Sequence, residues 1–124
     1  MMLNIYKLIT TQLKTINIPA YADLFPLNET KIYPYIVYNF QNTNTVNFAD
    51  LNLMEIDVWS KSTSMVEVET IAESIDEIFK SLLYNDVNIF VKTYRNKPYR
   101  LKLDEEENGI KRRQLRYVVK AYKK

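Results

Sequence analysis

The sequence contains no cysteine, no histidine and a single glycine, Gly109. Without cysteine there is no disulfide framework and no thiolate nucleophile, and without histidine the commonest general base and metal ligand is missing. One glycine is too few for the loops that cradle phosphates in nucleotide-binding proteins. No run approaches the ~18 consecutive apolar residues that a membrane helix needs, and residues 1–14 lack a signal-peptide pattern. We therefore expect no enzyme activity, no catalytic residue, no metal, no cofactor and no membrane partner.

What the sequence does contain is a globular composition. Hydrophobic residues make up 47% of the 124 positions and charged residues 26%. This balance and this length predict a single domain over residues 1–124 that can bury a core without disulfides or metal. The absence of cysteine fits a reducing compartment, so we expect a soluble protein of the cytoplasm.

Two segments show the three- and four-residue spacing of amphipathic helices. The first covers residues 3–15 and stops before Pro19. The second opens at Ser64, where Ser64 and Glu67 form the pattern of a capping box, and continues for about five turns. Its apolar stripe consists of Val68, Ile71, Ala72, Ile75, Ile78, Phe79, Leu82 and Leu83.

Alternating apolar and polar residues predict strands at 34–40, 51–60, 84–94, 99–103 and 110–122, with a further short one near 20–24. Residues 41–50 are an asparagine- and threonine-rich loop or hairpin tip, and 96–98 are a turn. The expected fold class is α+β: a single antiparallel sheet of four to five strands, with a short N-terminal helix and a long central helix packed on one face. The expected core includes Ile56, Val58, Ile71, Ile75, Phe79, Leu82, Leu115 and Val119.

Two acidic segments are the remaining candidates for catalysis or metal binding. Glu55 and Asp57 share one face of a predicted strand, so both could reach one cation or one water. The interpretation we favour is that they pair with lysines on a neighbouring strand. The run "DEEE" at 104–107 could hold a cation, but such runs are more often solvated turns.

Charge is unevenly distributed along the chain. Residues 1–91 hold 5 Lys or Arg against 11 Asp or Glu, a net charge of −6, whereas residues 92–124 hold 12 against 4, a net charge of +8. In the last predicted strand Arg112, Arg116 and Lys120 form an outward row with steps of about 7 Å. With Tyr117 and Tyr122 the row could bind nucleic acid, or it could protect an exposed sheet edge. We favour a protein interface, because the aromatic residues are spread over all strands and the acidic pole lies in the same chain.

The order of these features resembles a known family. A short N-terminal helix ends at "INIPAYADLFP", and "YPYIVYNF" and a strand ending "MEIDVWSKS" follow. A long helix and a closing strand rich in arginine and tyrosine complete the order. Together they resemble the tail-completion or tail-terminator proteins of long-tailed bacteriophages and prophages, over nearly the whole chain.

The resemblance implies a small α+β subunit that closes into a hexameric ring. Such a ring caps the tail tube, stops its growth and joins the tail to the head connector, while DNA only passes through the lumen. The implied partners are further copies of the chain, the tail-tube protein and the head connector protein. The implied location is the cytoplasm of a bacterial host and then the virion tail.

Rings are built from heterologous contacts, in which one face of a subunit meets a different face of the next. The hypothesis is therefore that Arg112, Arg116 and Lys120 meet the carboxylates of the long helix in a neighbouring subunit. Three alternatives stay open: a head or neck connector subunit, a small nucleic-acid-binding module that uses the basic strand, and an enzyme that uses Glu55 and Asp57. The expected helix partners are Glu69, Glu73, Asp76 and Glu77.

Overall fold

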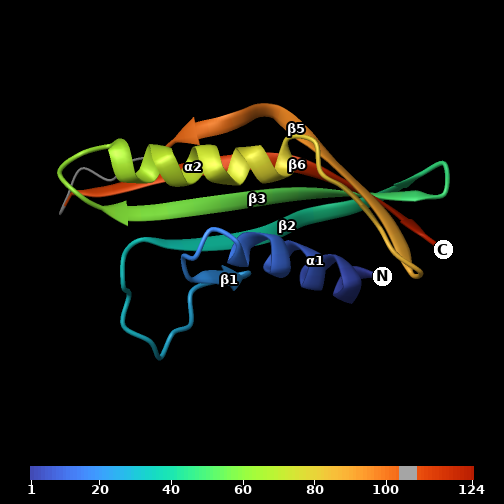
Figure 1. Ribbon diagram of the computed structural model, residues 1–124, viewed down its shortest axis with the longest axis horizontal. Coiled ribbons are helices and arrows are strands. Elements are labelled where there is room, and N and C mark those ends of the chain that lie inside the picture. The colour runs from blue at the N-terminus through green and yellow to red at the C-terminus, as the bar shows by residue number, and fades with distance from the viewer. Residues whose placement is uncertain (104–108) are drawn as a thin grey trace.

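The computed structural model describes residues 1–103 and 109–124, which form one sheet with two helices (Figure 1). The acidic run at 104–107 lies outside the described residues. The helices are α1 (Met2–Lys14) and α2 (Val66–Phe79). The strands are β1 (Ala20–Ala22), β2 (Tyr35–Val46), β3 (Ala49–Lys61), β4 (Leu83–Asn85), β5 (Ile89–Lys102) and β6 (Ile110–Lys123).

The prediction of four to five antiparallel strands beside one long central helix is wrong. The described sheet has six strands in the order β1-β2-β3-β6-β5-β4 and curls into a half-barrel. β1 runs parallel to β2, whereas the other neighbouring strands are antiparallel. The helices are nearly equal in length, with 13 and 14 residues. β1 lies within the short strand predicted near 20–24. β4 also has three residues, too few for the alternation that identifies a strand in a sequence.

The end of α2 explains why its length was overestimated. The helix ends at Phe79, where Thr93 of β5 contacts it. The Thr93 hydroxyl donates to the Phe79 carbonyl at 2.5 Å and accepts from the Leu82 amide at 3.2 Å. This contact satisfies a carbonyl that a helix end leaves without an intrahelical partner. Leu83 then pairs with Lys92 as part of β4, although its apolar side chain continues the helical pattern.

The predicted capping box at the start of α2 does not form. The Ser64 hydroxyl accepts a hydrogen bond from the Val66 amide at 3.1 Å. The Glu67 carboxylate does not return to Ser64, and instead accepts from the Ser60 hydroxyl at 2.5 Å. Glu67 therefore ties the helix to the end of β3.

Residues 41–50, predicted as a loop or hairpin tip, form the end of a tight hairpin. β2 and β3 stay paired as far as Val46 and Ala49, so only Asn47 and Phe48 form the turn. Both turn residues have positive φ, 48° and 68°, which matches the twist of two-residue hairpins. Threonine and asparagine fit this extended hairpin, because two threonine hydroxyls bond to side chains of the opposite strand.

β6 lies at the centre of the sheet, between β3 and β5. It pairs with β3 from Ala49 to Lys61 without a register shift, and its predicted range of 110–122 is confirmed within one residue. β5 contains the expected turn at 96–98 as an irregularity between Arg95 and Arg100, rather than as a break between two strands. The two predicted strands at 84–94 and 99–103 are therefore replaced by β4 and one long β5.

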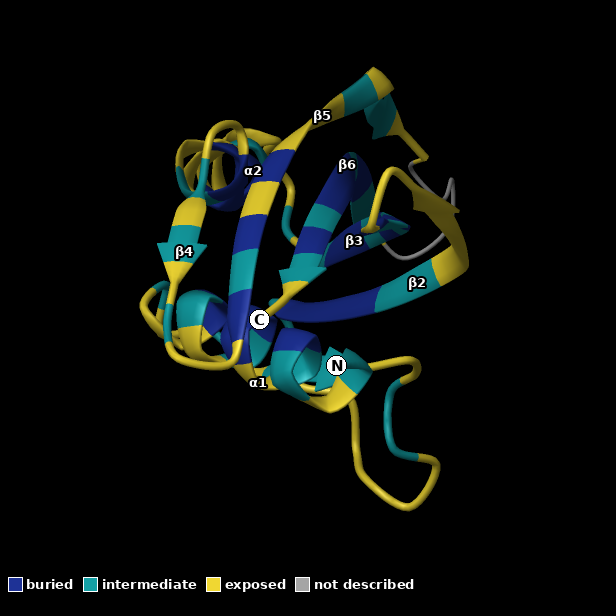
Figure 2. Cartoon of the chain, turned by 90° about the vertical axis from the view of Figure 1, so that its right-hand side faces the viewer, coloured by how far each residue is buried: buried dark blue, intermediate teal, exposed yellow. Residues whose placement is uncertain are grey.

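The core lies between the helices and one face of the sheet (Figure 2). Of the eight predicted core residues, seven are buried and Leu82 is partly buried against the cluster. α1 contributes Ile5, Leu8, Ile9 and Leu13, and α2 contributes Val68, Ile71, Ala72, Ile75 and Phe79. The amphipathic pattern of both helices was thus a correct guide to their buried sides.

Ile75 offers a direct test of this core, because its side chain is completely buried. We expect Ile75→Ala to lower the free energy of unfolding by about 2 to 5 kcal/mol, since the removed atoms leave a cavity that close packing cannot fill. Urea denaturation followed by circular dichroism measures the change. Val66→Ala is the control on the same helix, because Val66 is 67% exposed; equal losses in the two variants would contradict the packing described here.

Candidate functional site

The two faces of the sheet differ in chemistry. On the helix face, Leu115, Tyr117, Val119 and Ala121 of β6 are fully buried in the core. The opposite face, called the outer face here, carries the alternate residues of β6, and this division confirms the predicted alternation. They are Arg112, Gln114, Arg116, Val118 and Lys120.

An aromatic row crosses one end of the outer face; it consists of Tyr21, Phe25, Tyr35 and Trp59. Successive ring centroids lie 5.0 Å, 4.9 Å and 6.1 Å apart, and Tyr35 and Trp59 are stacked with an interplanar angle of 13°. The Arg112 guanidinium lies 4.7 Å from the Trp59 centroid, which is cation–π distance. The interpretation that the aromatic residues are spread over all strands rather than gathered in one place is therefore wrong at this end.

The aromatic row is built mainly of contacts between its own members. Tyr35 is only 3% exposed, and the half-buried Trp59 contacts both Tyr35 and Arg112. A platform for nucleic-acid bases needs ring faces that are open to the ligand. The row therefore supports the arrangement of the strands better than it supports base stacking.

Arg112 also belongs to a polar cluster with Asp57. One oxygen of the Asp57 carboxylate accepts from Arg112 Nε at 3.1 Å, from the Arg112 terminal nitrogen at 3.0 Å and from Gln114 Nε2 at 3.2 Å. Asp57 is 7% exposed, so these donors replace the water that it loses on burial. The favoured interpretation of Asp57, pairing with a cation on a neighbouring strand, is correct in kind, but the partner is an arginine rather than a lysine.

The other two members of the basic row are less firmly held. Arg116 donates from Nε to Gln114 Oε1 at 3.3 Å, and Glu55 lies opposite it in the β3–β6 register. Lys120 lies 5.5 Å from the Tyr122 ring centroid and faces Lys92 across the β5–β6 pair. Both side chains are partly exposed, so they are the members of the row that can still meet a partner.

The four helix carboxylates fall into two groups. Glu69 pairs with Arg100 and Arg113, and Asp76 pairs with Arg95 and accepts a hydrogen bond from the Tyr117 hydroxyl at 2.8 Å. These two acids face the sheet of their own chain, so the expectation that they point outward is wrong. The physical cause is that β5 and β6 present basic side chains on the helix face.

Glu73 and Glu77 lie on the solvent side of α2. Both are exposed, and Glu77 pairs with Lys80 at 2.9 Å in the same helix. The sequence-predicted site residues are therefore not gathered at one place within the chain. Basic side chains lie on the outer face of the sheet, and two exposed carboxylates lie beyond its other face, on α2.

The contacts of α2 change the pKa values of two buried groups. Burial alone would raise the pKa of Asp76, but hydrogen bonds from Arg95 and Tyr117 outweigh it and hold that pKa below its usual range. Burial, followed by the hydrogen bond to Asp76, raises the pKa of the Tyr117 hydroxyl. Tyr117 therefore remains a neutral donor, and Asp76 remains a charged acceptor at neutral pH.

Arg113 is the residue whose role the sequence interpretation missed. It is 4% exposed and pairs with Glu69, on the same side of β6 as Leu115 and Tyr117. The two-residue alternation that assigns Leu115 to the core also assigns Arg113 to it. A buried arginine needs a carboxylate partner, so this alternation was the available signal for the Glu69 pair.

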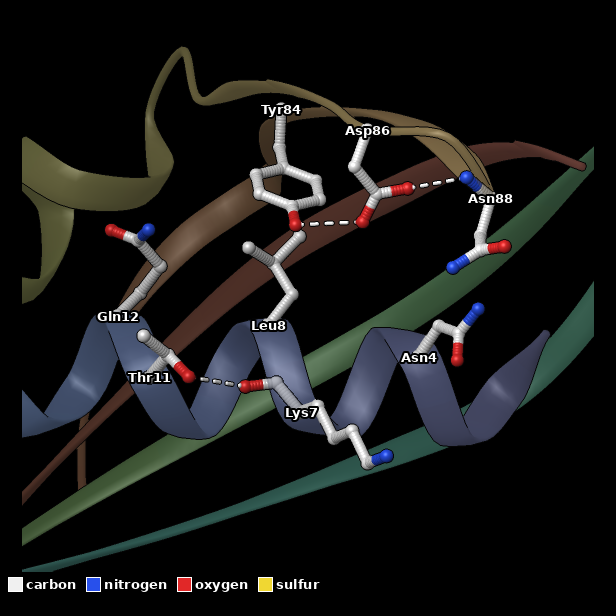
Figure 3. A pocket seen from close by; sticks show the side chains of 8 residues that line it. All are labelled: Asn4, Lys7, Leu8, Thr11, Gln12, Tyr84, Asp86 and Asn88. Carbon is white, nitrogen blue, oxygen red and sulfur yellow. Dashed lines mark hydrogen bonds between the residues drawn. The ribbon is translucent and has the colours of Figure 1, made fainter. Parts of the chain in front are cut away.

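A shallow pocket lies between α1 and the turn that joins β4 to β5 (Figure 3). The Asp86 carboxylate there accepts from the Tyr84 hydroxyl and the Asn88 amide at 2.7 Å each, and from the Ile89 amide at 2.9 Å. The Ile89 amide, then the Tyr84 hydroxyl and the Asn88 amide, hold the pKa of Asp86 below its usual range. These hydrogen bonds show that Asp86 stabilises the turn between β4 and β5.

A scan of protein-family models and a search of curated proteins both find no match to this chain. In residues 1–103 and 109–124, no group of three or more acidic side chains is placed to hold a metal ion. Neither of the described helices is both long enough and apolar enough to cross a bilayer.

Asp76 is a test of how α2 is held. We expect Asp76→Ala to lower the free energy of unfolding at neutral pH by about 1 to 3 kcal/mol, because it leaves the buried Tyr117 hydroxyl without its acceptor. Chemical denaturation measures the loss. Glu73→Ala is the control, since Glu73 lies exposed on the same helix and should change stability by no more than about 0.5 kcal/mol.

The same variant predicts a pH dependence. The pKa of Asp76 is lower in the folded chain than in the unfolded chain, so its charged form stabilises the fold above the unfolded value of about 4. This contribution is lost as pH falls through the folded pKa. The stability difference between the wild type and Asp76→Ala should therefore shrink in acid; a difference that stays constant from neutral pH to about pH 2 would contradict the assignment.

Proposed function

We propose that the protein is a ring-forming tail terminator or tail-completion protein of a long-tailed bacteriophage or prophage. It would cap the tail tube and join it to the head connector, with DNA passing through the ring. On this proposal the chain folds in the cytoplasm of a bacterial host and becomes part of the virion tail. The order of sequence features supports the family, and the α+β fold with both helices on one face is compatible with it.

The observation that carries the proposal is the separation of opposite charges to opposite sides of one small subunit. Arg116 and Lys120 lie partly exposed on the outer face, while Glu73 and Glu77 lie exposed on the solvent side of α2. A head-to-tail contact brings one side of a subunit against the other side of the next, which is the geometry that closes a ring. These charges would then set the register between subunits.

Ion pairs within the subunit reduce the number of residues that are available for the ring contact. Arg95, Arg100 and Arg113 of the basic half are paired with Asp76 and Glu69 of α2, so part of the charge difference along the sequence is neutralised within the subunit. Arg112 has Asp57 as its partner. The proposed contact therefore rests on Arg116 and Lys120 on one side and on Glu73 and Glu77 on the other.

A charge-reversal experiment tests this contact. We expect Arg116→Glu to abolish or strongly reduce rings, since removing one member of a desolvated pair weakens assembly by about 2 to 5 kcal/mol. Glu73→Arg should have the same effect alone, and the double variant should recover part of the assembly. Electron microscopy of the purified protein, alone and with its tail tubes, counts the rings.

Lys31→Glu is the matched control, because it makes the same change of charge in an exposed loop outside both surfaces. Circular dichroism checks that each variant remains folded. Normal rings from Arg116→Glu would refute this contact. If Arg116→Glu instead lowered DNA affinity with a shallower salt dependence, and Glu73→Arg did not restore it, the nucleic-acid-binding alternative would replace the ring.

A further inference from the structure

The outermost strands of the sheet, β1 and β4, are short and leave most of the edges of β2 and β5 without a pairing strand. β1 pairs only with Ile36–Tyr38 of β2, and β4 pairs only with Phe90–Lys92 of β5. Among the described residues, no strand pairs with the outer side of β2 over 39–46 or with that of β5 over 94–102. Unpaired backbone groups on such an edge can pair with a strand of another molecule.

The β5 edge is protected against such pairing. It carries Lys97 and Lys102, and Pro98 lacks a backbone N–H. Its register with β6 is also irregular between Arg95 and Arg100. Basic side chains, proline and an irregular register are the devices that keep natural sheet edges from joining. Two copies of this edge would in addition bring like charges together.

The β2 edge has almost none of these devices. The stretch "NFQNTNTV" over 39–46 contains no charged residue and no proline. The one register shift lies at its inner end, between Phe40 and Asn42, and the pairing with β3 is regular from Asn42 to Val46. Residues 41–46 are all exposed, as the yellow outer part of β2 shows (Figure 2).

The hairpin determines which backbone groups face outward. In a two-residue hairpin the closing pair, here Val46 and Ala49, is hydrogen-bonded, and the pairs alternate from there along the ladder. Thr43 and Thr45 therefore direct their backbone N–H and C=O groups away from β3. Their hydroxyls are already engaged, because Thr43 donates to Asn52 Oδ1 at 2.6 Å and Thr45 donates to Asp50 Oδ1 at 3.2 Å.

We propose that the partner of this edge is a second copy of the chain, paired β2 to β2 in antiparallel orientation about a two-fold axis at Asn44. Thr43 of each copy then lies opposite Thr45 of the other, and the two outward-facing residues supply about four backbone hydrogen bonds. The outward groups are symmetric about Asn44, so an identical edge is complementary to this one. Residues 39–46 carry no charge, so two copies of this edge can meet without like-charge repulsion.

This contact joins two sheets into one continuous sheet and is isologous, since the same surface serves both copies. It uses neither α2 nor the outer face. It is therefore independent of the ring contact proposed above, and either can be correct without the other.

Proline at position 45 tests the backbone pairing. Thr45→Pro removes an amide that points away from β3, so it should be tolerated in the hairpin, as proline is on sheet edges. Sedimentation velocity over a concentration series is run with Arg116→Glu in every sample, so that the proposed ring contact is absent. The otherwise unchanged chain should then form a dimer, and Thr45→Pro should raise the Kd of that dimer about tenfold or more. Thr45→Val is the matched control, because it keeps the amide, removes the hydroxyl and should still dimerise.

Charges at position 44 test the two-fold axis. Asn44→Lys and Asn44→Asp each place like charges opposite each other. In the same Arg116→Glu background each variant alone should therefore be monomeric where the unchanged edge gives a dimer. An equimolar mixture of the two should form dimers again. This second test decides the proposal if Thr45→Pro fails to fold by circular dichroism.

Three results would overturn the proposal. The first is an Arg116→Glu chain with the unchanged edge that stays monomeric throughout the concentration series. The second is a folded Thr45→Pro variant that assembles to the same extent as the chain with Thr45. The third is a mixture of Asn44→Lys and Asn44→Asp that remains monomeric.

Discussion

The arrangement of the whole domain depends on how two carboxylates fasten α2 to the sheet. Glu69 and Asp76 are seven residues apart, about two helical turns, so they lie on the same side of the helix. One reaches Arg100 and Arg113, and the other reaches Arg95 and Tyr117. The apolar stripe of α2 would allow the helix to slide or rotate on the sheet, because apolar contact is non-directional. The directed polar contacts select one position.

These ion pairs also determine which charged side chains remain available at the surface to bind another molecule. A buried arginine such as Arg113 requires its carboxylate nearby, because an uncompensated buried charge is strongly destabilising. Glu69 is therefore engaged by arginines of its own chain and is a poor partner for another molecule. Charge is therefore less unevenly distributed over the exposed surface than the difference between residues 1–91 and 92–124 suggests. Both proposals above accordingly use a few exposed charges or the backbone of a sheet edge.

The sequence predicted the elements whose patterns are long and local. α1, α2 and β6 each run for thirteen residues or more, and their periodicity located their buried sides correctly. It failed where a distant contact decides the outcome. Leu83 continues a helical stripe, but Thr93, far along the chain, ends the helix before it. The three-residue strand β4 and the contact of Glu67 with Ser60 are likewise fixed by tertiary neighbours.

Only part of the candidate site could be predicted from the sequence. Alternation along β6 placed Arg112, Arg116 and Lys120 on one face, and the structure confirms that placement. Spacing along α2 could not separate the inward pair Glu69 and Asp76 from the outward pair, because that division depends on arginines of β5 and β6. A carboxylate on a helix can point to water or to a buried cation, and only the packing of the two elements decides which.

The central position of β6 has a consequence for how the protein is made. It follows every other strand in the chain, yet it lies between β3 and β5, which have no direct pairing with each other. Until residues 110–123 have left the ribosome, β3 and β5 belong to two separate half-sheets with unsatisfied inner edges. At a synthesis rate of about 5 to 20 residues per second, that interval lasts seconds. The nascent chain is then at its most vulnerable to wrong pairing, and β6 ends this period by filling the gap from both sides.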